Sequence, residues 1–157
     1  MRKILITGMS GTGKSTALTE LRRRGFDVVD TDDPGWTEWS DDDGGYVWRE
    51  DRMAQLLSRD DGPTLFVSGT VSNQGRFYPR FDAVVLLSAP AEVLLDRVAR
   101  RTTNDYGKSS AERDMILHHL ATVEPLLRAA CTHELDATRP LEDVVADLLA
   151  IASASRR

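Results

Sequence analysis

The sequence predicts an α/β protein with a parallel sheet, because short apolar runs alternate along the chain with segments of helical periodicity. Turn and capping signals separate these segments where helices should begin or end. The fourth apolar run has no polar residue, as expected for a central strand. The predicted strands cover residues 3–7, 27–30, 64–68, 83–87 and 132–135.

Helices are predicted between these strands. The first ends at Gly25, a favourable stop, and Pro125 is expected to kink the fourth. Residues 31–45 are rich in glycine, proline and aspartate and are predicted to be largely loop. The predicted helices cover residues 14–24 and 47–58, a third begins at 90, a fourth extends from a capping box at 109–112 to about 127, and the last begins at 140.

Composition indicates one soluble domain over residues 1–157. The chain is 41% hydrophobic and 29% charged, and no apolar stretch approaches the roughly 20 residues that span a bilayer. Its start shows no secretory pattern, and Cys131 is the only cysteine, so we expect a cytoplasmic protein without an intrachain disulfide. The net charge of -5 disfavours nucleic acid as a partner.

The most specific motif is the run Gly8–Ser15, G-M-S-G-T-G-K-S, directly after the first predicted strand. A strand, this loop and a helix starting near the lysine form the setting in which backbone N–H groups surround phosphate oxygens. The lysine of such a loop reaches the β- and γ-phosphates, and the next hydroxyl binds Mg²⁺. The predicted nucleotide-binding residues here are Gly8, Ser10, Gly11, Thr12, Gly13, Lys14, Ser15 and Thr16.

With this loop placed, the order of the other motifs resembles the small P-loop kinases of the shikimate, gluconate and adenylate kinase type, which are often labelled AAA-family ATPases. The resemblance covers essentially the whole chain. It implies a three-layer P-loop NTPase fold whose five-stranded parallel sheet has the order 2-3-1-4-5, and Mg²⁺-dependent phosphoryl transfer from ATP to a small molecule. It also implies an acceptor-binding lobe at about 31–62 and a lid at about 102–112.

Asp30 and Asp32 close the second predicted strand, where alternate residues point the same way. Both carboxylates are therefore expected at the carboxyl edge of the sheet, where ligands bind in such folds. The pair resembles the Asp-x-Asp of shikimate-kinase-like enzymes, which implies that Asp30, with Ser15, serves Mg²⁺ and that Asp32 orients the acceptor hydroxyl. Asp33 is an alternative to Asp32.

Arg97 and Arg101 share a face of the third predicted helix, one turn apart. They resemble the Arg-x-x-x-Arg of adenylate-kinase-like enzymes, which implies that Arg97 lies near adenine and that Arg101 neutralises phosphate charge together with Lys14. Arg100 is an alternative for the second role.

Two further segments have either a functional or a purely structural interpretation. Arg139 and Pro140 resemble the loop that flanks the adenine base, and a simple helix-start turn explains them equally well. Ser68-Gly69-Thr70 resembles the family's substitute for a Walker B acid, and a tight turn would also explain its glycine. No Asn-Lys-x-Asp guanine motif is present, so ATP is expected rather than GTP.

The predicted acceptor lobe contains all three tryptophans, which either wall a pocket or cover the lobe's own core. Arg49, Arg52 and Arg76 would suit an anionic acceptor, whereas the acidic run 41–43 favours a cation or a solvated loop. The candidate acceptor residues are Asp32, Asp33, Trp48, Arg49, Arg52, Gly69, Asn73 and Arg76.

We therefore expect a Mg²⁺- and ATP-dependent kinase, monomeric or homodimeric, whose acceptor is a nucleoside, nucleotide, sugar or hydroxy acid. The catalytic candidates are Lys14, Asp32 and Arg101. The alternative is a nucleotide-binding regulatory ATPase that acts through a protein partner, with the Trp-rich lobe as the contact surface. A nucleic-acid end kinase is disfavoured by the acidic lobe, and no membrane partner is expected.

Overall fold

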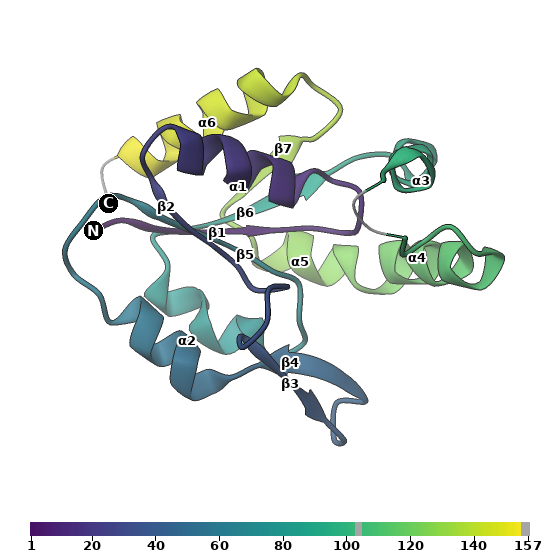
Figure 1. The fold of residues 1–157 in the computed structure, drawn as a ribbon, viewed down its shortest axis with the longest axis horizontal. Helices are drawn as coiled ribbons and strands as arrows, with labels where there is room; N and C mark the ends of the chain where they lie inside the picture. The colour runs from purple at the N-terminus through teal and green to yellow at the C-terminus, as the bar shows by residue number, and fades with distance from the viewer. Residues whose placement is uncertain (103–104, 155–157) are drawn as a thin grey trace.

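Five parallel strands form the central sheet of the computed structural model, which describes residues 1–102 and 105–154 (Figure 1). The order across the sheet is β2-β5-β1-β6-β7, and every neighbouring pair is parallel. The α/β class is confirmed, and counting these five strands along the chain gives the predicted order 2-3-1-4-5. The strands are β1 (Lys3–Thr7), β2 (Asp27–Asp30), β5 (Leu65–Ser68), β6 (Ala83–Ser88) and β7 (His133–Asp136).

Helices cover both faces of the sheet, because alternate residues of each strand point to opposite sides. Ile4 and Ile6 pack with α1 (Lys14–Arg23) and α6 (Leu141–Ser153), whereas Leu5 packs with α2 (Glu50–Leu57) and the 3-10 helix η1 (Gln74–Arg80). All three side chains are completely buried. Figure 1 shows α1 and α6 above the sheet and α2 below it, so the fold has three layers.

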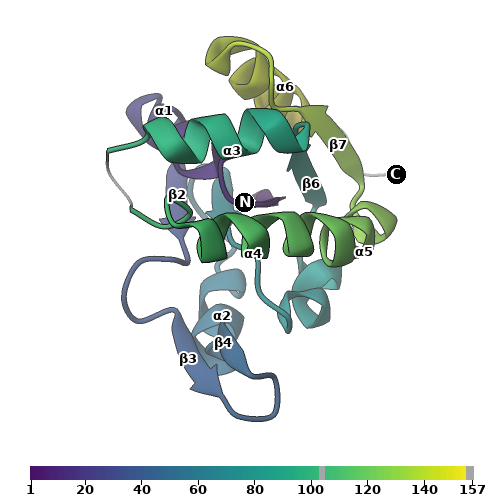
Figure 2. The ribbon, with the colours of Figure 1, turned by 90° about the vertical axis from the view of Figure 1, so that its right-hand side faces the viewer.

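Three further helices, α3 (Ala91–Arg100), α4 (Ser110–Thr122) and α5 (Glu124–Ala130), follow β6, and α4 contacts both α3 and α5 (Figure 2). The predicted capping box is present, since Ser109 Oγ accepts a hydrogen bond from Glu112 N at 3.1 Å. The predicted kinked helix is instead two helices. Pro125 lies in the first turn of α5, where a missing N–H costs nothing.

An antiparallel hairpin of β3 (Thr37–Ser40) and β4 (Gly45–Trp48) replaces the predicted loop over 31–45. The prediction of a helix beginning at Val47 was also wrong, because α2 begins at Glu50. The hairpin closes through Gly44, whose φ of 67° is left-handed and whose N–H donates to Ser40 O at 2.9 Å. Aromatic and β-branched residues on both short strands favour the pairing.

Two residues of the predicted lid, 103 and 104, lie outside the described residues. Its described part is packed closely: a Cβ on Gly107 would collide with Val98 Cγ1 and lie 2.8 Å from Ile116 Cδ1. Within 1–102 and 105–154, every helix is too short or too polar to cross a bilayer.

Candidate active site

The loop from Gly8 to Gly13 connects β1 to α1 and is fixed from two sides. A Cβ on Gly8 would collide with Leu87 O, so only glycine allows this approach to β6. Gly13, at the start of α1, has a φ of 91°, which other residues rarely adopt. On the other side, Thr70 Oγ1 donates to Gly8 O at 2.7 Å. The sequence analysis interpreted residues 68–70 together, as a Walker B substitute or a tight turn. It did not predict that the Thr70 hydroxyl would hold the loop at Gly8.

Lys14 lies at the first position of α1 and folds back over its own loop. Its Nζ donates to Gly8 O at 2.6 Å and to Met9 O at 3.1 Å. Desolvation lowers the pKa of Lys14 to about 8, against the opposing effect of Asp32 and Asp30. The Lys14 side chain is therefore held against the loop by two backbone carbonyl oxygens.

Ser15 and Asp30 meet beside the loop, with Ser15 Oγ donating to Asp30 Oδ2 at 2.8 Å. A hydroxyl and a carboxylate are the hard oxygen donors that Mg²⁺ uses when substrate phosphates and waters supply the rest of its shell. The described residues contain no group of three His, Cys, Asp or Glu side chains able to hold a metal ion. The pair therefore fits a metal that arrives with a nucleotide.

Asp32 and residues 10–16 line one cavity. Asp33 is absent from the lining of this cavity. Its N–H instead donates to Asp30 O at 3.0 Å and shapes the turn after β2. Desolvation and then repulsion from Asp30 raise the pKa of Asp32, with Lys14 acting in the opposite direction. Of the two alternatives in the sequence, the geometry favours Asp32.

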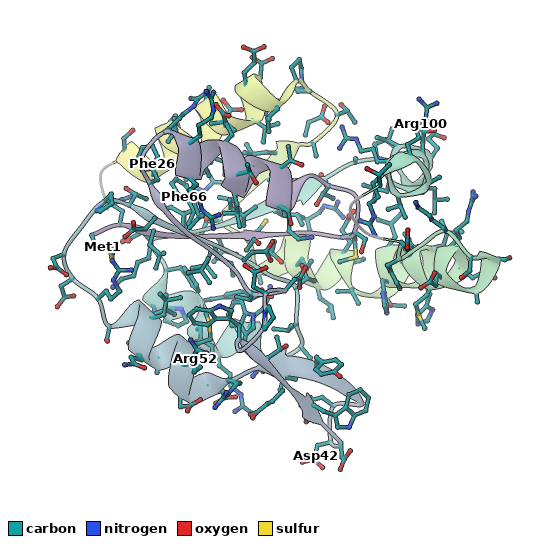
Figure 3. All side chains as sticks on the ribbon, in the orientation of Figure 1. Met1, Phe26, Asp42, Arg52, Phe66 and Arg100 are labelled. Carbon is teal, nitrogen blue, oxygen red and sulfur yellow. The ribbon has the colours of Figure 1, made fainter. Side chains whose placement is uncertain are left out.

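Three arginines at the C-terminal end of α3 also differ in whether they line this cavity. Arg97 bridges the two ends of the cavity, since Nη1 donates to Gly11 O at 3.3 Å and Nη2 to Ala137 O at 2.6 Å. Arg101 also lines the cavity, and its Nη2 donates to Tyr106 O at 2.7 Å. Arg100 pairs with Asp96 at 3.0 Å and points away from the rest of the molecule (Figure 3). Arg101, not Arg100, therefore belongs to the lining of the cavity.

The far end of the cavity is formed by the chain between β7 and α6. Arg139 lines it and is held by Asp147 at 2.7 Å. Pro140 precedes the first residue of α6 and does not line the cavity. Leu141 and Val144, which sequence reasoning did not select, provide apolar lining here. Their position depends on how α6 packs, so no local motif marks them.

These groups surround a single cavity of about 690 Å³, a volume typical of small-molecule sites. Lys14, Asp30, Asp32 and Arg101 give the loop end its charged groups, whereas Leu141 and Val144 provide apolar lining beside Arg139 at the other end. Its lining is Ser10–Thr16, Asp30, Asp32, Arg97, Arg101, Ala137, Arg139, Leu141 and Val144.

Several predicted acceptor residues have structural roles instead. Trp48 is completely buried, so it belongs to the core of the lobe and not to a pocket wall. Gly69 leaves room for it, because a Cβ there would lie 3.0 Å from Trp48 Cζ2. Arg52 donates to Gly35 O at 2.9 Å and lies 4.5 Å above the Trp36 ring. Neither Arg49 nor Arg52 lines the cavity beside the phosphate loop.

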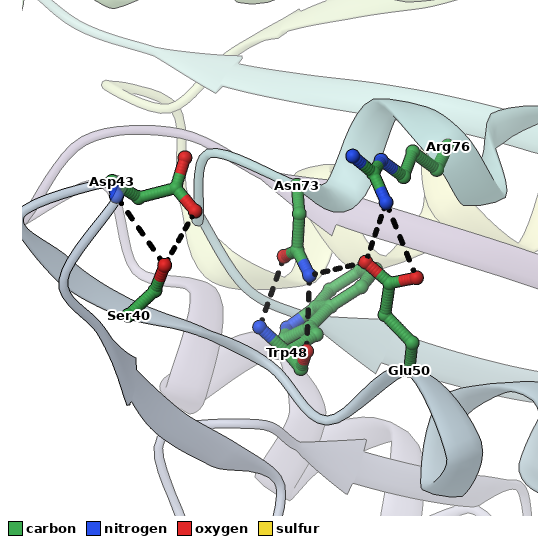
Figure 4. Close-up of polar contacts among 6 residues, drawn as sticks. All are labelled: Ser40, Asp43, Trp48, Glu50, Asn73 and Arg76. Carbon is green, nitrogen blue, oxygen red and sulfur yellow. Dashed lines mark hydrogen bonds and ion pairs between the residues drawn. The ribbon is translucent and has the colours of Figure 1, made fainter.

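A second cavity, of about 520 Å³, lies between the β3–β4 hairpin and the start of η1. Asn73 and Arg76, both predicted acceptor residues, line it. Figure 4 shows how Asn73 holds β4: its Oδ1 accepts from Trp48 N at 2.9 Å and its Nδ2 donates to Trp48 O at 3.0 Å. Glu50, which sequence reasoning missed, lies 3.1 Å from Arg76 and accepts from Asn73 at 3.2 Å.

Comparison with known proteins agrees with this geometry. A family model described as an AAA domain matches residues 4–118. Shikimate kinase 2 of Sodalis glossinidius is 30% identical over 162 residues, covering 93% of this chain and 92% of that protein. Among solved structures, shikimate kinase from Acinetobacter baumannii in complex with shikimate is 22% identical with a TM-score of 0.69, covering 96% of this chain and 92% of its own. The gluconokinase from Sinorhizobium meliloti 1021 is 21% identical with a TM-score of 0.60, and the match covers 97% of this chain and 91% of that chain.

The extent of these matches confirms the resemblance inferred from the motifs. The family model covers well over half of the chain, and the shikimate kinase match extends over nearly all of it. The chain belongs to the AAA-domain family and is a small P-loop kinase of the shikimate and gluconate kinase type, which uses ATP to phosphorylate a small molecule.

Proposed function

We propose that the chain transfers the γ-phosphoryl group of Mg²⁺-bound ATP to a hydroxyl group of a small-molecule acceptor placed beside Asp32. The observation that carries the proposal is the convergence of Lys14, Ser15, Asp30, Asp32 and Arg101 on one cavity. Phosphoryl transfer depends chiefly on positioning and charge neutralisation, and these are the groups that the reaction requires.

The phosphate end would hold the triphosphate through backbone N–H groups of residues 8–16, with Lys14 and Arg101 neutralising its charge. Bound Mg²⁺ would supply further neutralisation of phosphate charge, and Ser15 and Asp30 are the residues placed to hold it. At the other end, Leu141 and Val144 offer an apolar surface to the adenine ring.

Asp32 would align the acceptor hydroxyl and take its proton. Its raised pKa suits this role, because a carboxylate of higher basicity is a better proton acceptor near neutral pH. We assign residues 102–112 to a lid that excludes water. The bond from Arg101 to Tyr106 O would couple the lid to the phosphate site.

The test is ADP formation against a panel of nucleosides, nucleotides, sugars and hydroxy acids. We expect at least one compound to raise the rate above that without acceptor. Asp32→Asn should then lower the stimulated kcat by at least about a hundredfold while the protein still binds ATP. Asp33→Asn, the same change one residue away and outside the cavity, should retain near-native kcat. ATP binding with hydrolysis that no acceptor stimulates would contradict the proposal and favour the regulatory ATPase.

A further inference from the structure

The second cavity, beside the β3–β4 hairpin, is connected to the phosphate site by short covalent and hydrogen-bonded paths. Ser72 lines it and lies two residues after Thr70, whose hydroxyl contacts Gly8 O. Two residues span at most about 7 Å, so this wall lies next to the phosphate loop. A second path passes through Trp48. Its backbone N–H donates to Asn73, which lines the cavity, and its indole N–H donates to Thr31, which precedes Asp32. One wall of the cavity therefore lies beside the phosphate loop and the turn that carries Asp32. Asp32 itself lines the first cavity, so an acceptor held in the second would extend its hydroxyl group toward Asp32.

The charges on the wall of this cavity are mostly negative. Glu38, Asp43 and Glu50 line it, and Arg76 is the only cationic side chain among the described residues of its lining. Arg76 lies 3.1 Å from Glu50, so its charge already has a partner (Figure 4). Among the described residues, Glu38 has neither a side-chain hydrogen-bond partner nor an ion-pair partner, and its carboxylate is available to a ligand.

The arginines that would suit an anionic acceptor are used elsewhere. Arg52 is held by Gly35 O and the Trp36 ring, and Arg49 lies 4.0 Å from Asp51. An acceptor carboxylate in the cavity would face the like charges of Glu38 and Asp43, beside a guanidinium that is already paired with Glu50. An ammonium group would instead meet carboxylates and the ring of Trp39, which also lines the cavity.

We propose that this cavity binds the phosphoryl acceptor, and that the acceptor is a hydroxylated amine, positively charged at neutral pH, and not a hydroxy acid. The inference rests on the proposed function. In the step it describes, the acceptor oxygen bonds to the γ-phosphorus, whose bond to the bridging oxygen of ADP breaks. The hydroxyl proton passes to Asp32. The products are ADP and a phosphate monoester of the amine.

The experiment uses the whole chain, ATP labelled in its γ-phosphoryl group, and small metabolites separated at pH 7 into cationic, neutral and anionic fractions. Label transfer is followed by mass spectrometry, and ATP binding by calorimetry. We expect a labelled product from the cationic fraction alone. Transfer to a neutral or anionic compound would overturn the inference and leave the proposed function standing. ATP binding without transfer to any fraction would overturn both.

Glu38→Gln then tests the cavity directly with the compound that accepts label. Loss of a charged hydrogen bond should raise its KM by about tenfold, with kcat and the KM for ATP unchanged. The matched control is Asp42→Asn, which removes the same charge at the tip of the hairpin, outside the cavity lining (Figure 3). An equal rise in KM for both variants would show a distant field effect and contradict binding in the cavity.

Discussion

The indole Nε1–H of Trp48 donates to Thr31 Oγ1 at 2.9 Å, and the same hydroxyl donates to Ser68 O at 2.8 Å. Trp48 is the last residue of the hairpin, and Thr31 lies between Asp30 and Asp32. Both side chains are buried. One hydroxyl thus joins the core of the lobe, the end of β5 and the turn that carries the two site carboxylates.

Thr31→Val should lower the free energy of unfolding by about 1–3 kcal/mol, because valine keeps the shape but leaves the buried indole N–H and Ser68 O unpaired. Chemical denaturation measures the loss. Thr31→Ser keeps the hydroxyl and should recover most of the stability. Equal stability of the valine variant and the native protein would show that this hydroxyl is dispensable.

Gly69→Ala should also destabilise the protein, by about 1–3 kcal/mol, since the added methyl overlaps Thr31 Oγ1 and crowds the Trp48 ring. Gly45→Ala is the matched control, because a Cβ there meets nothing within 4 Å and its φ is not left-handed. Thermal unfolding of the two variants compares them. If Gly45→Ala lost as much stability, close packing at Gly69 would not be the cause.

Arg101→Gln should reduce kcat by at least about a hundredfold, as expected when a preorganised charge is removed from developing negative charge. Arg100→Gln removes the same charge from the adjacent position, where the side chain pairs with Asp96 on the exterior. Steady-state kinetics should show near-native kcat for this control. A larger loss in Arg100→Gln would reverse the assignment of the two arginines.

Affinity for Mg·ATP should fall as pH rises above 8. The pKa of Lys14 is lowered to about 8 in the free protein, and phosphate contacts in the complex favour its charged form. Binding above that pH therefore requires uptake of a proton, and Kd should increase by about tenfold between pH 8 and pH 9.5. Calorimetry in buffers of different ionisation enthalpy measures both effects. Lys14→Arg remains charged over this range, so its Kd should be nearly constant with pH. An unchanged native Kd would contradict the role given to Lys14.

The sheet could be predicted from sequence because its strands are local apolar runs with clear ends. Ile4 to Ile6 are apolar and followed at once by glycine-rich loop residues, and Ser109 caps α4 as its spacing with Glu112 indicated. The hairpin was missed because its strands are four residues each and their flanks are rich in turn residues. The spacing of Met53, Leu56 and Leu57 indicates the helix that follows but does not mark its first residue, so residues 47–49 were wrongly assigned to it.

The loop end of the candidate site could be proposed from sequence for a similar reason, since residues 8–16 are consecutive, and residues 10–16 line one cavity. The other parts depend on tertiary packing. Whether Trp48 faces a pocket or the core is decided by the face of β4 that meets the sheet, and nothing in its neighbours specifies this. Val144 lines the first cavity because of how α6 packs, and Glu50 lines the second cavity because α2 begins there.

The most direct test of the account is isothermal titration of Mg·ATP into the native protein and into Lys14→Ala. Native binding should saturate at one nucleotide per chain, and the loss of the ammonium group should weaken it by at least about tenfold, the scale of a charged hydrogen bond. Circular dichroism of both proteins controls for folding. Equal affinity of the two folded proteins, or no binding by the native one, would contradict the claim that this loop holds the triphosphate beside Asp32.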